Sequence, residues 1–410
     1  MSLSNTEQKI ADAIASRSAQ MLHDLSHLVS IPTGHGYKAG LEETRKWFSA
    51  RLSAMGAKIH RTSGSDRPDW LREPCVKGEG EFDSSDILYA DRLAGADDGV
   101  RILLSGHIDT VHDPAGTFQK LSDEQNGIRH GPGAADMKGG LIVALNALEV
   151  LHALGISVRW SFVLNADEES GSFCSAHQLQ LIAKKHDVGL VLEPAGGEGK
   201  FVTERSGSAQ FRIDAFGRAA HAGRDAALGI SAVAALCEAI SQVLSISDPA
   251  IGRTLNIGPL EGGEATNIVP DHAAAWGNAR YQNDEQRAEI DHALAKITTH
   301  DHALPRVTVK TIHNRPRKPA TAQVMAIAEI ALGIARDLSV SAGTISTGGV
   351  SDANVLQAAG LPCLDGLGVR GGNLHRIDEF VVTASLVERA TILALLINRL
   401  LSRPFVTSSL

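Results

Sequence analysis

The sequence predicts an α/β fold: a mostly parallel sheet with helices on both faces, and a second, smaller domain inserted into it. Between residues 100 and 192, apolar runs of strand length alternate with helical patterns and loops. Near residue 206 the order of elements changes to strand, helix, two strands, helix and strand. Pro316 and Pro319 then mark a return to longer helices. A chain of 410 residues is long enough for two domains with sizeable cores.

The larger domain is expected to begin with two amphipathic helices, because apolar residues recur on one helical face over residues 6–29 and 41–55. The next elements alternate as in a parallel sheet covered by helices. They are strands at residues 100–104, 158–164 and 188–192, and helices at residues 141–154 and 173–185. After the insertion we expect a helix at residues 324–336, a strand at 361–366 and a closing helix at 385–401.

The inserted segment is expected to be ferredoxin-like, because its elements follow the order βαββαβ. Its predicted strands lie at residues 209–216, 254–258, 273–281 and 306–313, and its helices at 230–246 and 285–298. The chain is therefore divided into residues 1–206 and 317–410, which form the larger domain, and residues 207–316, which form the inserted one.

The composition is that of a soluble globular protein, with 43% apolar and 21% charged residues. The formal net charge is −8 and no basic stripe stands out, so we expect no nucleic-acid partner. The four cysteines are far apart and form no C-x-x-C, which argues against a zinc knuckle or a disulfide framework. The start of the chain lacks a signal-peptide pattern, and the most apolar stretch is too short and too polar to span a membrane. We expect a cytoplasmic protein without a membrane partner.

His107 and Asp109 lie where the first predicted strand of the larger domain ends. In a metal site, the histidine would bind the metal through one ring nitrogen while the aspartate accepts a hydrogen bond from the other. Taken alone, the pair fits a strand-end histidine beside a solvated aspartate better. The interpretation changes because metal-type residues recur after the other strands.

Further potential ligands follow the neighbouring strands and loops. They are Asp136 in a glycine-rich loop, the adjacent pair Glu168 and Glu169, Glu193, and His375 near the C-terminus. In open α/β sheets ligands bind beyond the carboxyl ends of the strands, and clustered carboxylates repel one another unless a cation or proton lies between them. Two histidines with several carboxylates suit zinc, with cobalt or manganese as alternatives. A carboxylate shared by two metals would place them ~3.5–4 Å apart, as in two-metal hydrolases.

Other interpretations of these residues fit the sequence less well. The glycine-rich loop at residues 131–140 lacks the spacing of a phosphate-binding P-loop, and the chain contains no H-E-x-x-H. Two further function classes stay open: a non-catalytic metal-binding protein, and an interaction protein that uses the open edge of the small sheet. The adjacent glutamates Glu168 and Glu169 argue against the first, since one can bind a metal while the other serves as a general base. The second does not explain the cluster of metal-type residues.

These motifs together resemble those of the M20 family of metallopeptidases. They are His107-x-Asp109, the loop at residues 133–140, Asp167-Glu168-Glu169, Glu193-Pro194 and His375. The sequence Thr203-Glu204-Arg205-Ser206-Gly207, which follows Glu193-Pro194, is most similar to the glutamate carboxypeptidase and acetylornithine deacetylase-like branch. The resemblance extends from about the first helix to the last. It implies a catalytic metal-binding domain and, in residues 207–316, a lid through which two copies form a homodimer.

The resemblance implies two metals, most simply zinc, held by five side chains. His107 and Glu193 would bind one metal, and Glu169 and His375 the other. Asp136 would bridge the two, and the peptide bond that follows it would be cis.

The resemblance also implies roles for residues around the metals. Glu168 would be the general base, while His221 would steady the substrate carbonyl, often across a dimer interface. Asn267 and Arg280 would hold the substrate carboxylate, and Gly349 lies in a glycine loop that lines the site.

The implied reaction is hydrolysis of an amide bond that releases a C-terminal amino acid with a free carboxylate, as in glutamate carboxypeptidases. The substrate would be a small peptide or an N-acyl amino acid. The alternative is an N-acyl-amino-acid deacylase similar to acetylornithine deacetylase or succinyl-diaminopimelate desuccinylase. One position departs from the family pattern: Asn278 stands two residues before Arg280, where an acidic residue is usual.

Overall fold

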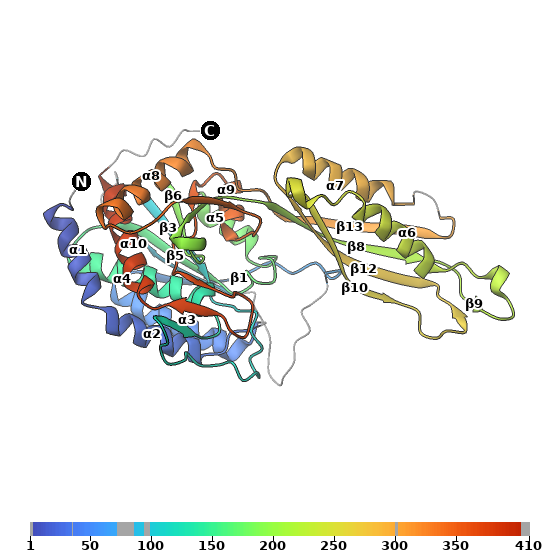
Figure 1. Ribbon diagram of the computed structural model, residues 1–410, viewed down its shortest axis with the longest axis horizontal. Coiled ribbons are helices and arrows are strands. Elements are labelled where there is room, and N and C mark those ends of the chain that lie inside the picture. The colour runs from blue at the N-terminus through green and yellow to red at the C-terminus, as the bar shows by residue number, and fades with distance from the viewer. Residues whose placement is uncertain (1–2, 35, 72–85, 94–98, 300–301, 403–410) are drawn as a thin grey trace.

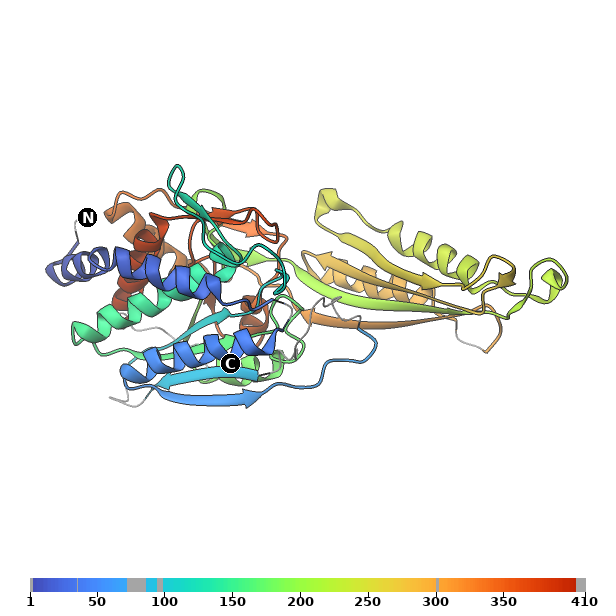
Figure 2. The same ribbon diagram turned by 90° about the horizontal axis from the view of Figure 1, so that it is seen from below.

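The computed structural model describes residues 3–34, 36–71, 86–93, 99–299 and 302–402. These residues form two lobes (Figure 1). One lobe contains a six-stranded sheet and most of the helices, and the other is an elongated lobe built on a four-stranded sheet. A second view shows the same two lobes, joined by long strands (Figure 2). The predicted fold class is confirmed.

The six-stranded sheet is mostly parallel, in the order β1-β2-β5-β3-β6-β15. Its strands are β1 (Lys58–Ser63), β2 (Asp86–Arg92), β3 (Arg101–His107), β5 (Arg159–Asn165), β6 (Val188–Val191) and β15 (Cys363–Leu364). β3 runs parallel to both β5 and β6, and β15 runs parallel to β6. β2 is antiparallel to both of its neighbours, so it alone opposes the direction of the sheet. The central strands β5, β3 and β6 therefore all end at one edge.

Helices cover both faces of this sheet. On one face lie α1 (Asn5–Ala15), α2 (Ser18–Ser30), α3 (Lys38–Ala54), α4 (Gly140–Ala153), α8 (Ala322–Asp337) and α10 (Ser385–Leu401). On the other face lie α5 (Ala176–Ala183) and α9 (Asp352–Ala358). Successive side chains of a strand point to opposite faces, so Ile102 and Leu104 of β3 pack with the first group and Leu103 with the second.

Two local predictions for the larger lobe need correction. The opening helix is not continuous over residues 6–29 but breaks between α1 and α2. At the break Arg17 leaves helical geometry, donates a hydrogen bond to Asn146 and pairs with Glu149 of α4. These tertiary contacts override the helical periodicity. Strand β1 was not predicted, because its residues are mostly exposed and lack an apolar alternation.

The elongated lobe follows the predicted order βαββαβ. Its elements are β8 (Gly207–Phe216), α6 (Ala232–Leu244), β10 (Thr254–Gly262), β12 (His272–Tyr281), α7 (Asp284–Lys296) and β13 (Arg306–Arg315). The antiparallel sheet has the order β10-β12-β8-β13, and both helices pack on one face of it (Figure 1). The opposite face carries no helix among the described residues, and it is the face that bears on the site described below. The division at residues 206/207 and 316/317 stays our proposal for the domain boundaries.

Short elements complete the described structure. They are β4 (Ile128–His130), η1 (Ala134–Gly139), η2 (Gly197–Gly199), β7 (Phe201–Arg205), β9 (Ala220–His221), η3 (Ala226–Leu228), η4 (Pro249–Ile251), β11 (Ile268–Val269), β14 (Thr344–Thr347), β16 (Gly371–Gly372) and β17 (Phe380–Val382). None of the helices among the described residues has the length and apolar character needed to cross a membrane.

Candidate metal centre

Three neighbouring strands bring metal-type side chains to one edge of the large sheet. β3 ends at His107, the turn after β5 carries Glu168 and Glu169, and Glu193 follows β6. The segment η1, whose first turn contains Asp136, packs against α4 beside these strand ends. The strand order thus places residues that are far apart in sequence at one edge, as the sequence predicted.

Asp136 lies between two imidazole rings. Its Oδ1 is 3.3 Å from Nε2 of His107, and its Oδ2 is 3.4 Å from Nε2 of His375. A further carboxylate lies beside each ring: Glu193 Oε1 is 3.9 Å from His107 Nε2, and Glu169 Oε2 is 3.3 Å from His375 Nε2. Each oxygen of Asp136 therefore faces a separate pair of a histidine and a glutamate.

The donor set fits divalent cations. Potential ligand atoms of His107, Asp136 and Glu169 all lie within 4.8 Å of one another. Oδ1 of Asp136 is buried and has no hydrogen-bond partner among the described residues. Imidazole nitrogens and carboxylate oxygens are the donors that zinc, manganese and cobalt accept. A cation beside Asp136 would satisfy its unpartnered oxygen.

The electrostatics of the cluster favour positive charge at two places. Burial and the neighbouring Asp136 raise the pKa of Glu193 well above its ordinary value, and the same two causes raise the pKa of Glu169. Hydrogen bonds with Asp136 and Glu169 raise the pKa of His375 to about 11. Burial lowers the pKa of His107, but its acidic neighbours outweigh burial and raise it well above the usual range. Both histidines thus lie where positive charge is stabilised.

Asp109 fixes the orientation of His107. Nδ1 of His107 lies 3.0 Å from the backbone carbonyl oxygen of Asp109 and 3.3 Å from its Oδ1. The other carboxylate oxygen, Oδ2, accepts a hydrogen bond from the backbone N–H of Glu169 at 3.0 Å. An N–H at Nδ1 leaves Nε2 as the free donor atom toward Asp136. Asp109 therefore ties a histidine of the first pair to a glutamate of the second.

The backbone of the Asp136 loop is held by Glu379, which the sequence did not indicate. Oε1 of Glu379 accepts hydrogen bonds from the backbone N–H groups of Ala135 and Asp136, at 2.8 and 3.0 Å. Oε2 accepts one from the N–H of Gly133 and lies 2.7 Å from Nε2 of His112. The peptide bond after Asp136 is cis, as the family resemblance implied.

Glu168 points toward the same region but is paired differently. Its side chain is buried, and its Oε1 lies 2.8 Å from Nη2 of Arg315, which also donates to the backbone carbonyl of Glu168. Burial raises the pKa of Glu168 to about 8, while the positive charges of Arg315 and His107 oppose the increase. Arg315 was not predicted, because it belongs to β13 and no local pattern links it to Glu168.

A cavity of about 270 Å³ opens onto the cluster. Its walls include Asp136, Glu168, Glu169, Glu193 and His375 from the large lobe, together with Arg280, Arg315 and Gly349. Burial and repulsion from the nearby guanidinium group of Arg315 lower the pKa of Arg280. A carboxylate entering the cavity would relieve that repulsion. Arg280 and Gly349 thus lie in the wall of the cavity that also contains the metal-type side chains.

His221 and Asn267 are not brought to the cluster within this chain. His221 belongs to β9, at the far end of the elongated lobe (Figure 1). It is exposed, and its Nδ1 accepts hydrogen bonds from the backbone N–H groups of Gly223 and Arg224, at 3.1 and 3.2 Å. The backbone carbonyl of Asn267 accepts a hydrogen bond from Ala222, so these two predicted residues lie beside each other. The two form a separate group at the tip.

Comparison with known proteins identifies the family. The model of peptidase family M20/M25/M40 matches residues 103–399, which is well over half of the chain. The chain belongs to this family. The match includes all five proposed metal ligands and the inserted lobe. The protein is accordingly a metal-dependent hydrolase of amide bonds, a peptidase or an amidohydrolase.

Two similar proteins have names that state an activity. Carboxypeptidase G2 of Pseudomonas sp. (strain RS-16) is 27% identical over 386 residues, which cover 91% of this chain and 87% of the relative. Succinyl-diaminopimelate desuccinylase of Nitrosococcus oceani is 27% identical over 309 residues, covering 69% and 79%.

Solved structures share the fold. A tripeptidase from Staphylococcus aureus has a TM-score of 0.76 at 24% identity, covering 94% of this chain and 99% of that one. A Bacillus subtilis protein described as a dinuclear metal-binding peptidase of the M20 family has a TM-score of 0.64 at 15% identity, covering 95% and 99%.

Proposed function

We propose that the protein is a two-metal hydrolase that cleaves an amide bond and releases a C-terminal amino acid with a free carboxylate. The observation that carries the proposal is the position of Asp136. Its two oxygens face separate histidine–glutamate pairs at 3.3 and 3.4 Å from the rings, as a carboxylate that bridges two metals requires. The similarity to carboxypeptidase G2 supports the carboxypeptidase-type reaction.

Zinc is the proposed metal, with cobalt or manganese as alternatives. His107 and Glu193 would hold one ion, Glu169 and His375 the other, and Asp136 both. When bound, the ions would polarise the scissile carbonyl and favour ionisation of a water molecule.

Glu168 is the proposed general base. It lines the cavity beside the ligands and does not pair with either histidine, so its carboxylate is available to a water molecule there. A buried carboxyl group with a raised pKa both accepts and returns protons near neutral pH. Glu168 would take a proton from the attacking water and deliver it to the leaving nitrogen. Arg315 would hold the side chain in position through the contact at 2.8 Å.

Arg280 is the proposed anchor for the substrate carboxylate. A guanidinium group binds a carboxylate through two parallel hydrogen bonds, which fixes the orientation of the scissile amide as well as its distance. Gly349 lies on the wall of the same cavity, and its carbonyl accepts a hydrogen bond from Arg205 at 3.1 Å.

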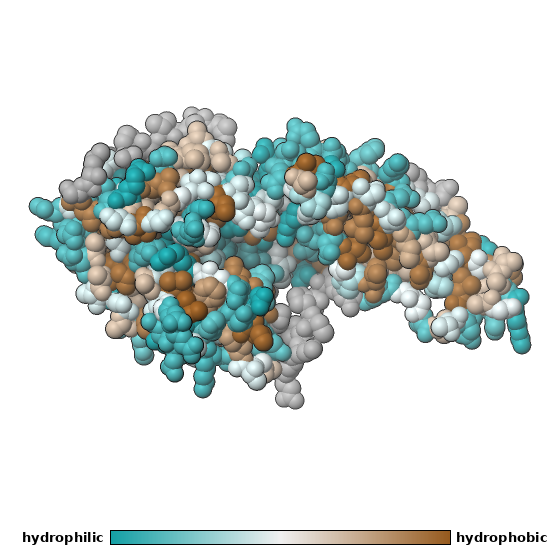
Figure 3. Space-filling view, in the orientation of Figure 1, coloured by the Kyte–Doolittle hydropathy of each residue, from teal (hydrophilic) through white to brown (hydrophobic). Residues whose placement is uncertain are grey.

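His221 and Asn267 are proposed to act in a second copy of the chain. They lie at the tip of the elongated lobe, so a homodimer formed through residues 207–316 would let each tip reach the partner's cavity. Figure 3 shows apolar residues on the surface of the elongated lobe, and a homodimer would cover such residues. The exposed large apolar side chains of the elongated lobe are Leu228, Leu244, Ile251, Leu260 and Ile268.

A second candidate reaction is removal of the acyl group from an N-acyl amino acid. The similarity to succinyl-diaminopimelate desuccinylase supports it. Both reactions break an amide next to a carboxylate, and they differ in the acyl group.

A panel of N-acyl amino acids and dipeptides, assayed with zinc-loaded protein, tests both reactions. Release of a free amino acid from at least one member is expected. Glu168→Gln should keep its metal content and lose at least about 100-fold in kcat, the usual contribution of a general base. Hydrolysis by this variant at the wild-type rate would contradict the role of Glu168.

A further inference from the structure

The chain passes between the two lobes twice, through residues 205–208 and residues 315–318. These segments lie side by side and run antiparallel: Arg205 and Lys318 exchange two backbone hydrogen bonds, at 2.9 and 3.0 Å. We call the paired segments the crossing. It contains both covalent connections between the lobes, so contacts made there bear directly on how the elongated lobe is oriented.

The backbone hydrogen bonding within the crossing is interrupted at Pro316. In an antiparallel pair of segments, residue pairs that exchange hydrogen bonds alternate with pairs that do not. Two residues beyond the bonded pair described above, the next pair that should exchange them is Gly207 with Pro316. Proline has no backbone N–H, so at most one of the two bonds can form. Backbone pairing alone therefore leaves the crossing weak at the point where the chain changes lobes.

Asn354 fills this gap with its side-chain amide. Its Nδ2 donates to the backbone carbonyl of Ser206 at 2.8 Å and to that of Pro316 at 2.7 Å. Both partners are carbonyl oxygens, which only accept, so the amide nitrogen has to face them. Oδ1 of Asn354 accepts a hydrogen bond from the backbone N–H of Ser351 at 3.0 Å, at the start of α9. Asn354 is fully buried, so one side chain ties both segments of the crossing to the large lobe away from water.

The crossing also carries the arginine that contacts the proposed general base. Arg315 is the last residue of β13, and its Nη2 lies 2.8 Å from Oε1 of Glu168. The same nitrogen donates to the hydroxyl of Ser172 at 2.6 Å, and that hydroxyl donates to Asp352 in the first turn of α9. The first turn of α9 therefore contacts both the crossing and the network around Arg315.

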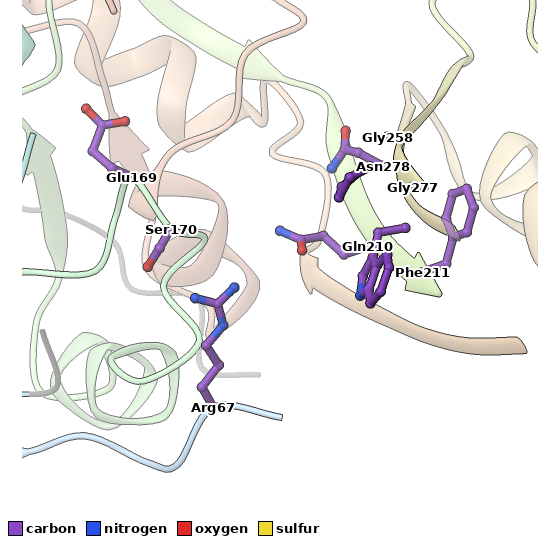
Figure 4. Close-up of a pocket in the computed structure, with 10 residues that line it drawn as sticks. Arg67, Glu169, Ser170, Gln210, Phe211, Gly258, Gly277 and Asn278 are labelled. Atoms are coloured by element: carbon purple, nitrogen blue, oxygen red, sulfur yellow. The ribbon is translucent and has the colours of Figure 1, made fainter. Parts of the chain in front are cut away.

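Beyond the crossing, the lobes face each other across a second cavity of about 410 Å³, which Trp276 also lines. The residues on one side are Arg67, Glu169 and Ser170, and those on the other are Gln210, Phe211 and Asn278 (Figure 4). Nε1 of Trp276 donates a hydrogen bond to the backbone carbonyl of Trp70 at 2.8 Å. A cavity does not fix the orientation of its walls, and a single hydrogen bond fixes only one distance. The direction of the elongated lobe therefore depends on the crossing.

We propose that Asn354 is a positioning residue that joins the two segments of the crossing into one unit and thereby holds Arg315 against Glu168. The inference rests on the proposed function, because it assigns Glu168 the role of base. Among the described residues, Asn354 lines neither of the two cavities between the lobes. Its effect on the reaction passes through the crossing and not through contact with the substrate.

Asn354→Asp separates this role from a role in capping α9. Aspartate has the same shape and still accepts the N–H of Ser351, but its ionised carboxylate cannot donate to the two carbonyls. For the best substrate of the panel, kcat/KM should fall about tenfold. Asn354→Ala should cause a similar loss without adding a charge, and it serves alone if Asn354→Asp does not fold. Asn5→Asp, at an exposed position of α1, should have no effect.

Combining variants tests whether Asn354 acts through Arg315. In an Arg315→Ala background, Asn354→Ala should lower kcat/KM by less than about twofold, because the group that it positions is already missing. A loss as large as in the wild-type background would overturn the proposal. Wild-type activity of Asn354→Ala alone would overturn it too.

Hydrogen–deuterium exchange tests the crossing without reference to activity. The backbone N–H groups of Arg205 and Lys318 donate across the crossing, so they should exchange at least about tenfold faster in Asn354→Ala. Peptides from β3 and α6 should stay within about twofold of the wild type, since each lobe has its own core. Unchanged exchange at the crossing would overturn the proposal. Equally accelerated exchange in β3 and α6 would show that Asn354 stabilises the whole fold, and would also contradict a positioning role.

A crystal structure of Asn354→Ala distinguishes failure of this inference from failure of the proposed function. If the zinc-loaded wild type hydrolyses no member of the panel, the proposed function fails, and the position of Arg315 is still measurable. Nη2 of Arg315 should then lie beyond hydrogen-bond distance, more than ~3.5 Å, from Oε1 of Glu168. A contact kept at the wild-type distance would show that Asn354 does not position Arg315.

Discussion

The candidate metal cluster and the tip of the elongated lobe both contain residues that the family resemblance singled out, but the two groups lie far apart in one chain. His107, Asp136 and Glu169 converge within one chain because adjacent strands end at one edge of a sheet. His221 and Asn267 also lie together, but at a distance from that edge (Figure 1). The cluster residues converge because the strands that carry them are neighbours in one sheet. Whether the tip residues reach a cluster depends instead on how the two lobes, or two chains, are arranged. The cluster is thus assembled within one chain, and we propose that the tip contributes to the site of a partner chain.

Removing the carboxylate of Asp136, the proposed bridge between the metals, should have the largest effect on metal content and activity. Asp136→Ala takes away the carboxylate that faces both histidines, so both metals should be lost and kcat/KM should fall by at least about 1,000-fold. Metal per chain, measured by mass spectrometry, and hydrolysis of the best substrate check this. Asp123→Asn, which neutralises an exposed carboxylate, should retain both metals. Full metal content in Asp136→Ala would break the assignment.

Mixing two inactive variants tests whether the tip works across chains. His221→Ala lacks the tip group, and Glu168→Gln lacks the base, so each alone should be nearly inactive. Hybrid dimers would contain one intact site built from both chains. An equal mixture, unfolded and refolded together, should recover about a quarter of the wild-type activity, since half of the random dimers are hybrids with one working site. No recovery, with hybrid dimers confirmed by mass, would place the tip in its own chain or outside catalysis.

Replacing Arg280 should have an intermediate effect on KM, limited to substrates that carry a free carboxylate. Arg280→Ala should raise KM about 10- to 100-fold for substrates with a free carboxylate, since a charged hydrogen-bonding pair contributes ~1.5–3 kcal/mol. The same substrate with a carboxamide in place of the carboxylate should be affected little. Arg306→Ala, at the other end of the small sheet, serves as the control. Equal losses for both substrates would argue that Arg280 is structural.

The pKa of His186 is lowered, whereas that of His107 is raised. Replacing His186 should have the smallest effect of these changes, and it should alter stability alone. Nδ1 of His186 lies 2.8 Å from the carbonyl of Ile182, and Nε2 lies 2.8 Å from the hydroxyl of Ser161. Burial outweighs the nearby carboxylate of Asp187 and lowers the pKa of His186 to about 4. The unfolded chain therefore binds the extra proton first, so the free energy of unfolding should decrease by ~3 kcal/mol as the pH falls from 6.5 to 4.

Urea titrations at several pH values measure this decrease. His186→Gln should remove most of this pH dependence between pH 6.5 and 4. If the variant and the wild type lose the same stability over that interval, the pKa of His186 is not depressed.

The convergence of the metal-type side chains could be predicted from the sequence because their positions obey a general rule. His107, Glu169 and Glu193 each follow a strand, and neighbouring parallel strands end at one edge. The βαββαβ order of the small lobe could also be predicted, since its strands and helices differ clearly in periodicity.

The groups that support the cluster could not be predicted. Glu379 acts through hydrogen bonds to the backbone of the loop at residues 133–136, which no side-chain pattern reveals. Arg315 meets Glu168 because two lobes pack together, and that packing is not encoded by any local motif. The second cavity, between Arg67 and Trp276, depends on the same packing.

The proposed two-metal centre is tested most directly by anomalous X-ray diffraction from crystals of zinc-loaded protein at the zinc absorption edge. We expect two anomalous peaks ~3.5–4 Å apart, one on each side of the Asp136 carboxylate. One peak should lie beside His107 and Glu193, and the other beside Glu169 and His375. A single peak, or two peaks that do not share Asp136, would contradict the bridging role on which the proposed function depends.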